Sequence, residues 1–220
     1  MKQPFFFASI TALLLFSCGE GKVHSREKLA VSTSNNLSVT DSIKPKKKIY
    51  LDRAELGDCL KNAPKIVPIN SVGTPFDTLN YNQIVAYKYF NQGERNPRVY
   101  RLYNSRWGLL IDVIEKQHAM NQSEADQFLR LISARSTYGG MRMACFEPRL
   151  GIVFYKDGLY VSQISICMEC NYLEAPFVIP ALERQQKISE KHYTGDNDYG
   201  FSRKGRNGIN QLLEEFKFVE

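Results

Sequence analysis

Apolar residues recur with helical spacing in two parts of the chain. The positions i, i+3, i+4 and i+7 are filled first by Ala125, Phe128, Leu129 and Ile132, and later by Ile209, Leu212, Leu213 and Phe216. Asn121 stands before the first stripe with Glu124 three residues later, which is the sequence pattern of a capping box. We therefore predict a helix that begins after Asn121 and ends before residues 138–140, and a second helix at the C-terminus.

A shorter helix and several strands are predicted before residue 121. Residues 51–60 carry a partial helical stripe that ends before Pro64. Residues 83–90 and 98–103 are rich in β-branched and aromatic residues, which favours strands. The apolar run 109–114 suits a strand or a short helix.

The strongest hairpin signal lies between Cys145 and Cys170. Asp157-Gly158 favours a type I′ turn, because both of its central residues must tolerate positive φ. Pro148 is expected to interrupt the ladder with a bulge or a bend. Pairing Lys156 with Leu159 sets Phe154 opposite Val161, Ile152 opposite Gln163, and Cys145 opposite Cys170.

The segments after the hairpin give weaker signals. Residues 175–180 contain two prolines and are predicted to be extended. Residues 183–201 are polar and mixed, with a turn-like stretch at 194–200. Residues 200–208 are rich in glycine and basic residues and are read as a loop that leads into the last helix, with an anion site as the alternative. Because helices and strands do not alternate regularly, we predict an α+β domain: a mainly antiparallel sheet with a hairpin around Asp157-Gly158, covered by two or three helices.

The N-terminus resembles a secretory signal. Lys2 precedes the apolar run 5–16, which is too short for a comfortable membrane span. The run ends in Leu15-Phe16-Ser17-Cys18, which resembles the bacterial lipobox. By that resemblance residues 1–17 form a lipoprotein signal peptide, and Cys18 becomes the lipidated first residue of the mature protein. Several acyl chains on one residue anchor a protein stably to a membrane.

Residues 18–49 are polar and lack apolar periodicity, so we predict a flexible tether followed by a single globular domain over 50–220. The expected location is the cell envelope of a bacterium, on the outer membrane or the periplasmic face rather than the inner membrane. The expected partners are the membrane, through the lipid, and another envelope protein.

Charge argues against a nucleic-acid partner. The chain has a formal net charge of +6. Residues 18–49 hold seven basic and three acidic residues, a net of +4, whereas residues 50–220 hold 21 basic and 20 acidic residues. The domain is therefore nearly neutral and has no compositional support for binding nucleic acid.

Four cysteines remain in the domain: Cys59, Cys145, Cys167 and Cys170. The bacterial envelope permits disulfides, and the hairpin register favours a bond between Cys145 and Cys170, or Cys167 if a bulge shifts the register. Cys167 and Cys170 also have the spacing of a zinc knuckle, with Cys145 as third ligand and Cys59 or His118 as fourth. The third alternative is a redox pair, although such pairs normally begin a helix, whereas this one ends a predicted strand.

The hairpin resembles part of an uncharacterised family of bacterial envelope lipoproteins. That family carries Cys-Phe-x-Pro-Arg-His, a hydrophobic hairpin and Ile-Cys-Phe-x-Cys, where this chain reads CFEPRLGIVFY and then ISICMEC. Leu150 replaces the family's histidine, which argues against a Cys–His site there. The resemblance implies the same fold and no particular activity.

No common catalytic motif is found, neither a nucleophile elbow, nor a Walker loop, nor a dinucleotide fingerprint. Neither a catalytic residue nor a cofactor is expected, apart from zinc at the cysteines. The leading hypothesis is a non-enzymatic, lipid-anchored domain that binds or scaffolds another envelope component. The alternative is a thiol-redox or zinc-binding envelope protein that uses Cys145, Cys167 and Cys170.

Overall fold

The computed structural model describes residues 50–68, 75–90, 99–104, 108–191 and 199–219. The predicted signal peptide, lipidated Cys18 and tether lie outside these residues. Within them, no helix is both long enough and apolar enough to cross a membrane.

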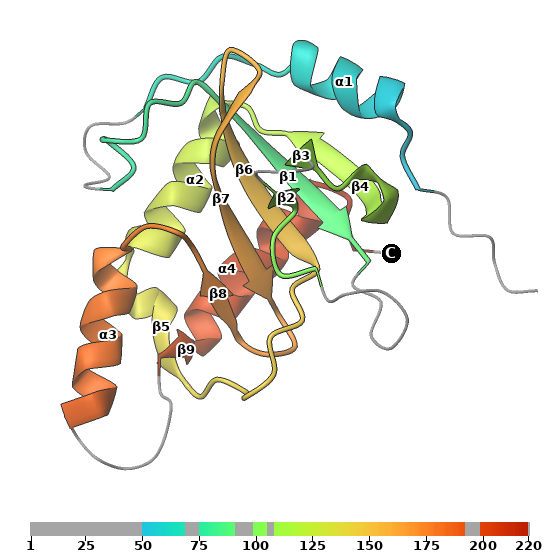
Figure 1. The fold of residues 1–220 in the computed structure, drawn as a ribbon. Coiled ribbons are helices and arrows are strands. Elements are labelled where there is room, and N and C mark those ends of the chain that lie inside the picture. Colours follow the sequence, from blue (N-terminus) through green and yellow to red (C-terminus); the bar gives the residue numbers. More distant parts are fainter. Residues whose placement is uncertain (1–49, 69–74, 91–98, 105–107, 192–198, 220) are drawn as a thin grey trace, which may run out of the picture. The chain divides into compact units, whose positions relative to one another are not determined.

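The centre of the domain is an antiparallel sheet of five strands in the order β4-β1-β6-β7-β8 (Figure 1). The strands of this sheet are β1 (Gln83–Tyr89), β4 (Ile114–Ala119), β6 (Leu150–Lys156), β7 (Leu159–Cys167) and β8 (Tyr172–Glu174). Two small ribbons accompany it, formed by β2 (Tyr103–Asn104) with β3 (Gly108–Leu109) and by β5 (Tyr138–Gly140) with β9 (Gly200–Phe201). The predicted α+β class with a mainly antiparallel sheet is confirmed.

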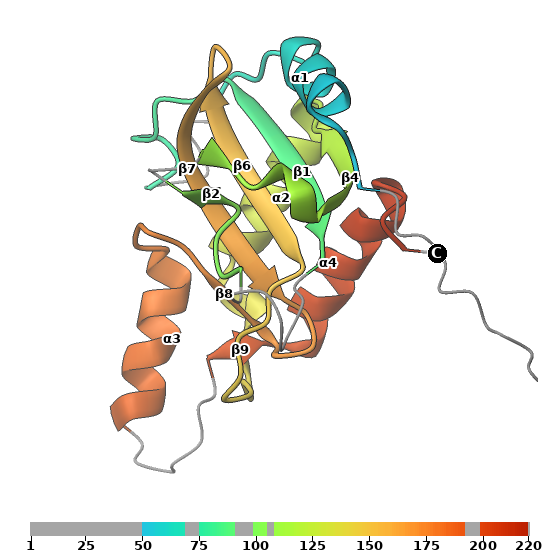
Figure 2. The ribbon, with the colours of Figure 1, turned by 45° about the vertical axis from the view of Figure 1, so that its right-hand side comes forward.

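Helices and small ribbons cover the two faces of the sheet. The α-helices are α1 (Arg53–Lys61), α2 (Gln122–Ser133), α3 (Pro180–Lys191) and α4 (Arg203–Glu215), and the 3-10 turns are η1 (Ile111–Val113) and η2 (Arg135–Thr137). Figure 2 shows α2 and α4 behind the sheet and the β2–β3 ribbon in front of it. α1 packs beside the edge strand β4.

The alternation of side chains along β1 explains why the sheet is buried on both faces. Ile84 and Ala86 belong to the larger core, which α2 and α4 share. Val85, Tyr87 and Tyr89 point to the opposite face and belong to a second core that includes Leu56 of α1. Both faces of β1 are therefore covered, and β1 lies between β4 and β6 in the sheet.

The predicted helix after Asn121 is confirmed in detail. The Asn121 side chain accepts a hydrogen bond from the Glu124 backbone N–H, and the Glu124 carboxylate accepts one from the Asn121 N–H. All four predicted stripe residues of α2 are buried. The predicted short helix near residue 53 is α1, and the predicted C-terminal helix is α4.

The hairpin turn is confirmed, but the predicted register beyond it is wrong. Asp157 and Gly158 both have positive φ, and Lys156 pairs with Leu159. The ladder then shifts by one residue, so Phe154 pairs with Ser162 and Ile152 with Ile164. The shift places Ile164 on the same face as Ile152, inside the larger core. Without the bulge Ile152 would face the amide of Gln163.

Three other predictions are corrected by the structure. Of the predicted strand 98–103, residue 98 lies outside the described residues and only Tyr103 is in a strand. Leu102 is fully buried in the second core. Of the polar stretch 183–201, residues 183–191 lie in a helix, α3. Residues 200–208 are not a loop, since they form β9 and the first turns of α4 after the cap Ser202. The turn-like residues 194–198 lie outside the described residues.

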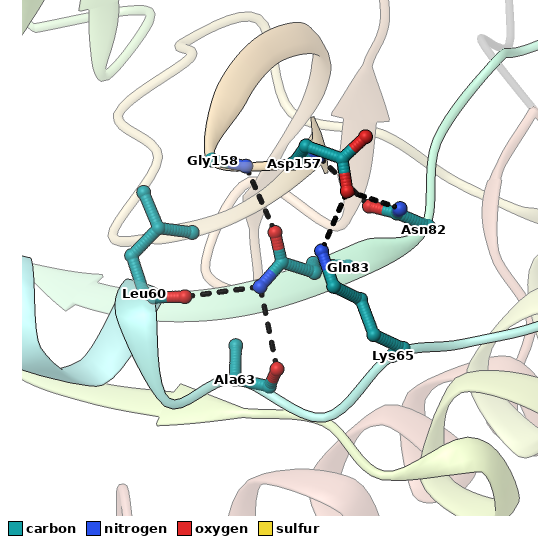
Figure 3. Close-up of polar contacts among 7 residues, drawn as sticks. All are labelled: Leu60, Ala63, Lys65, Asn82, Gln83, Asp157 and Gly158. Atoms are coloured by element: carbon teal, nitrogen blue, oxygen red, sulfur yellow. Dashed lines mark hydrogen bonds and ion pairs between the residues drawn. The ribbon is translucent and has the colours of Figure 1, made fainter.

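A buried amide fixes the hairpin turn to the rest of the domain (Figure 3). The Gln83 side chain is 3% exposed and donates to the carbonyl oxygens of Leu60 at 3.0 Å and Ala63 at 3.3 Å. Its oxygen accepts from the Gly158 N–H at 2.9 Å. Beside it, hydrogen bonds from Lys65 and Asn82 hold the pKa of the exposed Asp157 carboxyl below its usual value. One side chain thus joins α1, β1 and the β6–β7 turn.

We expect the Gln83→Leu variant to lose about 2–4 kcal/mol of unfolding free energy, because buried carbonyl and N–H groups would be left without partners. Asp157→Asn is the matched control, since Asn-Gly also favours the type I′ turn and the position is exposed. The control is expected to unfold close to the wild-type midpoint, because surface substitutions of this kind usually change stability little. Urea unfolding followed by circular dichroism measures both, and equal midpoints for the two variants would contradict the role of Gln83.

Candidate functional site: three sulfur atoms at the end of β7

The Cys-x-x-Cys pair lies in the tight turn between β7 and β8. Cys167 is the last residue of β7, which confirms that the motif ends a strand. Cys167 and Cys170 form a disulfide with an S–S distance of 2.06 Å. Their exposed fractions are 0% and 1%, so the bond is shielded from solvent.

This pairing differs from the predicted bond between Cys145 and Cys170. β6 begins only at Leu150, after Pro148, so Cys145 does not occupy a ladder position opposite Cys170. The turn instead brings the Cα atoms of Cys167 and Cys170 to 5.1 Å, within the range that a disulfide requires. The tight turn, rather than the hairpin register, therefore determines the bond.

Cys145 nevertheless reaches the same place. It is exposed and carries a free thiol, and its Sγ lies 3.7 Å from the Sγ of Cys170. Two hydrogen bonds donated by backbone N–H groups hold the segment around Cys145. The Met143 N–H donates to the Cys170 carbonyl at 2.9 Å, and the Glu147 N–H donates to the Cys170 Sγ at 3.2 Å. The structure thus places the Cys145 thiol next to the Cys167–Cys170 disulfide.

An aromatic lid covers the buried disulfide. Phe146 and Tyr172 form a small apolar cluster with the two cysteines, and their ring centroids are 4.7 Å apart. Tyr100 stacks on Phe146 from the outside at 6.5 Å. These rings exclude water from one side of the disulfide and leave Cys145 beside it at the surface.

Asn171 and Arg206 anchor the turn, a role that was not predicted from the sequence. Asn171 has a φ of 64°, and its amide donates to the carbonyls of Met141 at 2.7 Å and Phe201 at 2.9 Å. The Arg206 guanidinium donates to the Asn171 side-chain oxygen at 2.8 Å and to the Met168 carbonyl at 2.6 Å. Arg206 belongs to residues 200–208, for which an anion site was the alternative prediction, and its contacts instead bind α4 to the Cys-x-x-Cys turn. An Asn directly after the motif was the available clue, because Asn tolerates positive φ.

The other two candidate ligands belong to different parts of the domain. Cys59 lies in α1, packs against the second core, and has its thiol pKa raised by burial. His118 lies in β4, where its Nε2 is 2.9 Å from the Glu124 carboxylate and its ring stacks on Phe216. Neither residue joins the three sulfur atoms. Among the described residues, no group of three or more His, Cys, Asp or Glu side chains is arranged to hold a metal ion.

A pocket of about 240 Å³ adjoins the motif. Met168 and Glu169, the two residues between the cysteines, form part of its wall. The remaining wall residues come from β1, β6, β7, α4 and the segments beside them: Lys88, Arg149, Leu150, Ile166, Leu213 and Phe218. A change in the cysteine turn would therefore alter this pocket directly.

Comparisons with protein-family models, with curated proteins and with solved structures find no match for this chain.

Proposed function

We propose that this chain is a lipid-anchored cell-envelope protein whose domain exchanges its disulfide with the thiols of another envelope protein. The observation that carries the proposal is the exposed thiol of Cys145, 3.7 Å from a sulfur atom of the buried Cys167–Cys170 disulfide. Thiol–disulfide exchange needs a thiolate in contact with a disulfide sulfur, and the site brings the two groups together. The exchange needs none of the standard catalytic motifs, since its reacting groups are cysteines alone.

The size of the disulfide loop favours chemistry over a structural cross-link. Closing a loop of four residues, as Cys167 and Cys170 do, stabilises by only about 2 kcal/mol on the chain-entropy model. The bond first predicted, between Cys145 and Cys170, would close 26 residues and give about 3.5 kcal/mol on the same model. A bond that contributes so little to stability has room for a redox role.

The lipid anchor at Cys18 supplies the compartment in this proposal, because the bacterial envelope permits disulfides. Mass spectrometry of the mature N-terminus tests the anchor, together with globomycin, which blocks removal of lipoprotein signal peptides. We expect an acylated Cys18. An unmodified Cys18 in the mature protein would refute the anchor.

The exchange itself is tested on the full chain purified from membranes in detergent. The folded protein is equilibrated with graded ratios of reduced to oxidised dithiothreitol, quenched in acid, and analysed for free thiols by alkylation and mass spectrometry. We expect Cys167 and Cys170 to move reversibly between the disulfide and dithiol forms while the domain stays folded. A disulfide that opens only when the domain unfolds would contradict the proposal.

A second candidate is a non-enzymatic domain that binds or scaffolds an envelope partner. Two exposed methionines favour it, Met141 at 62% and Met143 at 54%, both on the segment that the cysteine turn holds. Flexible methionine side chains at a surface suit protein contacts. Cross-linking in intact cells, followed by purification of the tagged protein, tests this candidate, which predicts that a Met141→Ser/Met143→Ser variant loses the cross-linked partner while the three cysteines can be replaced without effect.

Zinc is a candidate ligand of the reduced site, because Cys145, Cys167 and Cys170 would then offer three thiolates. Metal analysis of protein purified without chelators, combined with a count of free thiols, tests it. One zinc ion per chain with four free thiols in the domain would support zinc in place of exchange.

A further inference from the structure

The geometry points to Cys145 as a relay that carries the buried disulfide to the surface: its thiolate displaces Cys167 from Cys170, and the outside partner then reacts at Cys145. This inference rests on the proposed exchange function and assigns the route by which that exchange occurs.

The disulfide is buried, whereas the Cys145 thiol beside it is exposed. Cys167 and Cys170 are 0% and 1% exposed, and Phe146 and Tyr172 pack against them. A thiol of another protein cannot reach either sulfur atom in the folded domain. Cys145 is exposed and contacts Cys170, so among the described residues it is the thiol that connects the buried bond with the outside.

The contact between Cys145 and Cys170 determines which sulfur atom of the disulfide is attacked. Cys145 contacts Cys170, so its attack on Cys170 forms the Cys145–Cys170 bond and breaks the Cys167–Cys170 bond, and the electron pair of the broken bond stays on Cys167. The backbone N–H of Cys170 already donates to the Cys167 Sγ at 3.0 Å. This N–H stabilises the leaving thiolate, because a hydrogen bond to an ionised acceptor is stronger than one to a neutral acceptor.

The first step is an exchange of one disulfide for another and needs no added oxidant. The Cys145 thiol loses its proton to water, the Cys167 thiolate takes up a proton, and one disulfide replaces another. The new bond includes Cys145, which lies at the surface. The two disulfide isomers thus share Cys170 and differ in whether the bond is reachable.

The second step consumes a dithiol of the partner. A partner thiolate attacks the Cys145 Sγ, the Cys145–Cys170 bond breaks, and Cys170 leaves as a thiolate. The partner's second thiolate then attacks its own bonded sulfur and releases Cys145. The partner dithiol ends as a disulfide, and Cys145, Cys167 and Cys170 end as thiols. The partner class is therefore a protein with two neighbouring cysteines.

The inference is tested by the rate at which dithiothreitol opens the disulfide in the folded full chain. Samples are quenched in acid at timed points, alkylated and mapped by mass spectrometry. We expect Cys145→Ser to slow the opening of the Cys167–Cys170 bond at least about ten-fold, because a neighbouring thiol acts at a much higher effective concentration than one in solution. Cys59→Ser is the matched control, since Cys59 is the other free cysteine of the domain and lies at a different core. The control is expected to react at the wild-type rate.

The outcomes separate the relay from the proposed function. If Cys145→Ser keeps the wild-type rate while wild type opens in its folded state, the relay is wrong and the exchange function stands. If wild type itself does not open while folded, both are wrong. A Cys167→Ala variant adds an independent measurement, because it keeps the two sulfur atoms of the second isomer. We expect it to form the Cys145–Cys170 disulfide on oxidation, and its failure to do so in a folded domain would overturn the relay.

Discussion

The Asn171→Ala variant is expected to lose about 3 kcal/mol of unfolding free energy, because the substitution removes side-chain hydrogen bonds and places at positive φ an alanine, which tolerates that conformation less well than asparagine. Asn171 holds the segment before Cys145 through the Met141 carbonyl, the β9 strand through the Phe201 carbonyl, and α4 through Arg206. Its φ of 64° adds about 1 kcal/mol for an alanine, a cost that asparagine partly avoids. Urea unfolding of the oxidised protein measures the loss.

Asn171→Gly separates the two causes. Glycine adopts positive φ without strain, so this variant loses only the hydrogen bonds and should be more stable than Asn171→Ala by about 1 kcal/mol. Equal losses in the two variants would assign the whole effect to the hydrogen bonds. Wild-type stability in both would show that the network around Asn171 does not stabilise the turn.

Local signals in the sequence were sufficient where neighbours along the chain determine the structure. Asn121 and Glu124 cap a helix within one turn, and Asp157-Gly158 turns the chain through its own backbone conformation. The class of the fold followed from the order of such elements. The position of the Cys-x-x-Cys motif at the end of a strand also followed, because the hairpin that precedes it is a local structure.

The predictions failed where residues far apart in the sequence determine the local structure. The register shift between Phe154 and Tyr155 places Ile164, and not Gln163, in the core shared with α2 and α4. The sequence of the hairpin alone does not contain that core. α3 has few apolar residues, and only Ala181 of its residues is buried, so its stripe was too weak to recognise. Pro180 at its first position was the local clue.

The pairing of the cysteines was mispredicted for a related reason. A ladder was extended through Pro148 to Cys145, although β6 begins at Leu150. The positive φ of Asn171 closes the turn that brings Cys167 and Cys170 together, and contacts from Arg206, which lies 35 residues away, hold that turn. A contact over that separation cannot be read from the spacing of the cysteines.

The same substitution at two glycines is expected to have opposite effects on stability. Gly140 pairs with Gly200 where β5 meets β9, next to Asn171. A Cβ at Gly140 would overlap the carbonyl oxygen of Phe201 and lie 2.9 Å from its carbonyl carbon. These are backbone atoms, and the Phe201 N–H and carbonyl are both bonded to Asn171, so they cannot move without breaking the anchor of the cysteine turn. Gly140→Ala should therefore cost about 3 kcal/mol or more.

Gly57 provides the control for that prediction, since it lies in the exposed part of α1 and a Cβ there would have no heavy atom within 4 Å. Alanine favours a helix over glycine, so Gly57→Ala should stabilise the domain by about 0.5–1 kcal/mol. Thermal and urea unfolding of the two variants measure the opposite signs. If Gly140→Ala is as stable as wild type, the close contact between β5 and β9 does not anchor the cysteine turn. In that case Asn171 cannot hold Cys145 beside Cys170 through this ribbon, and the relay would depend on the hydrogen bonds of Met143 and Glu147 alone.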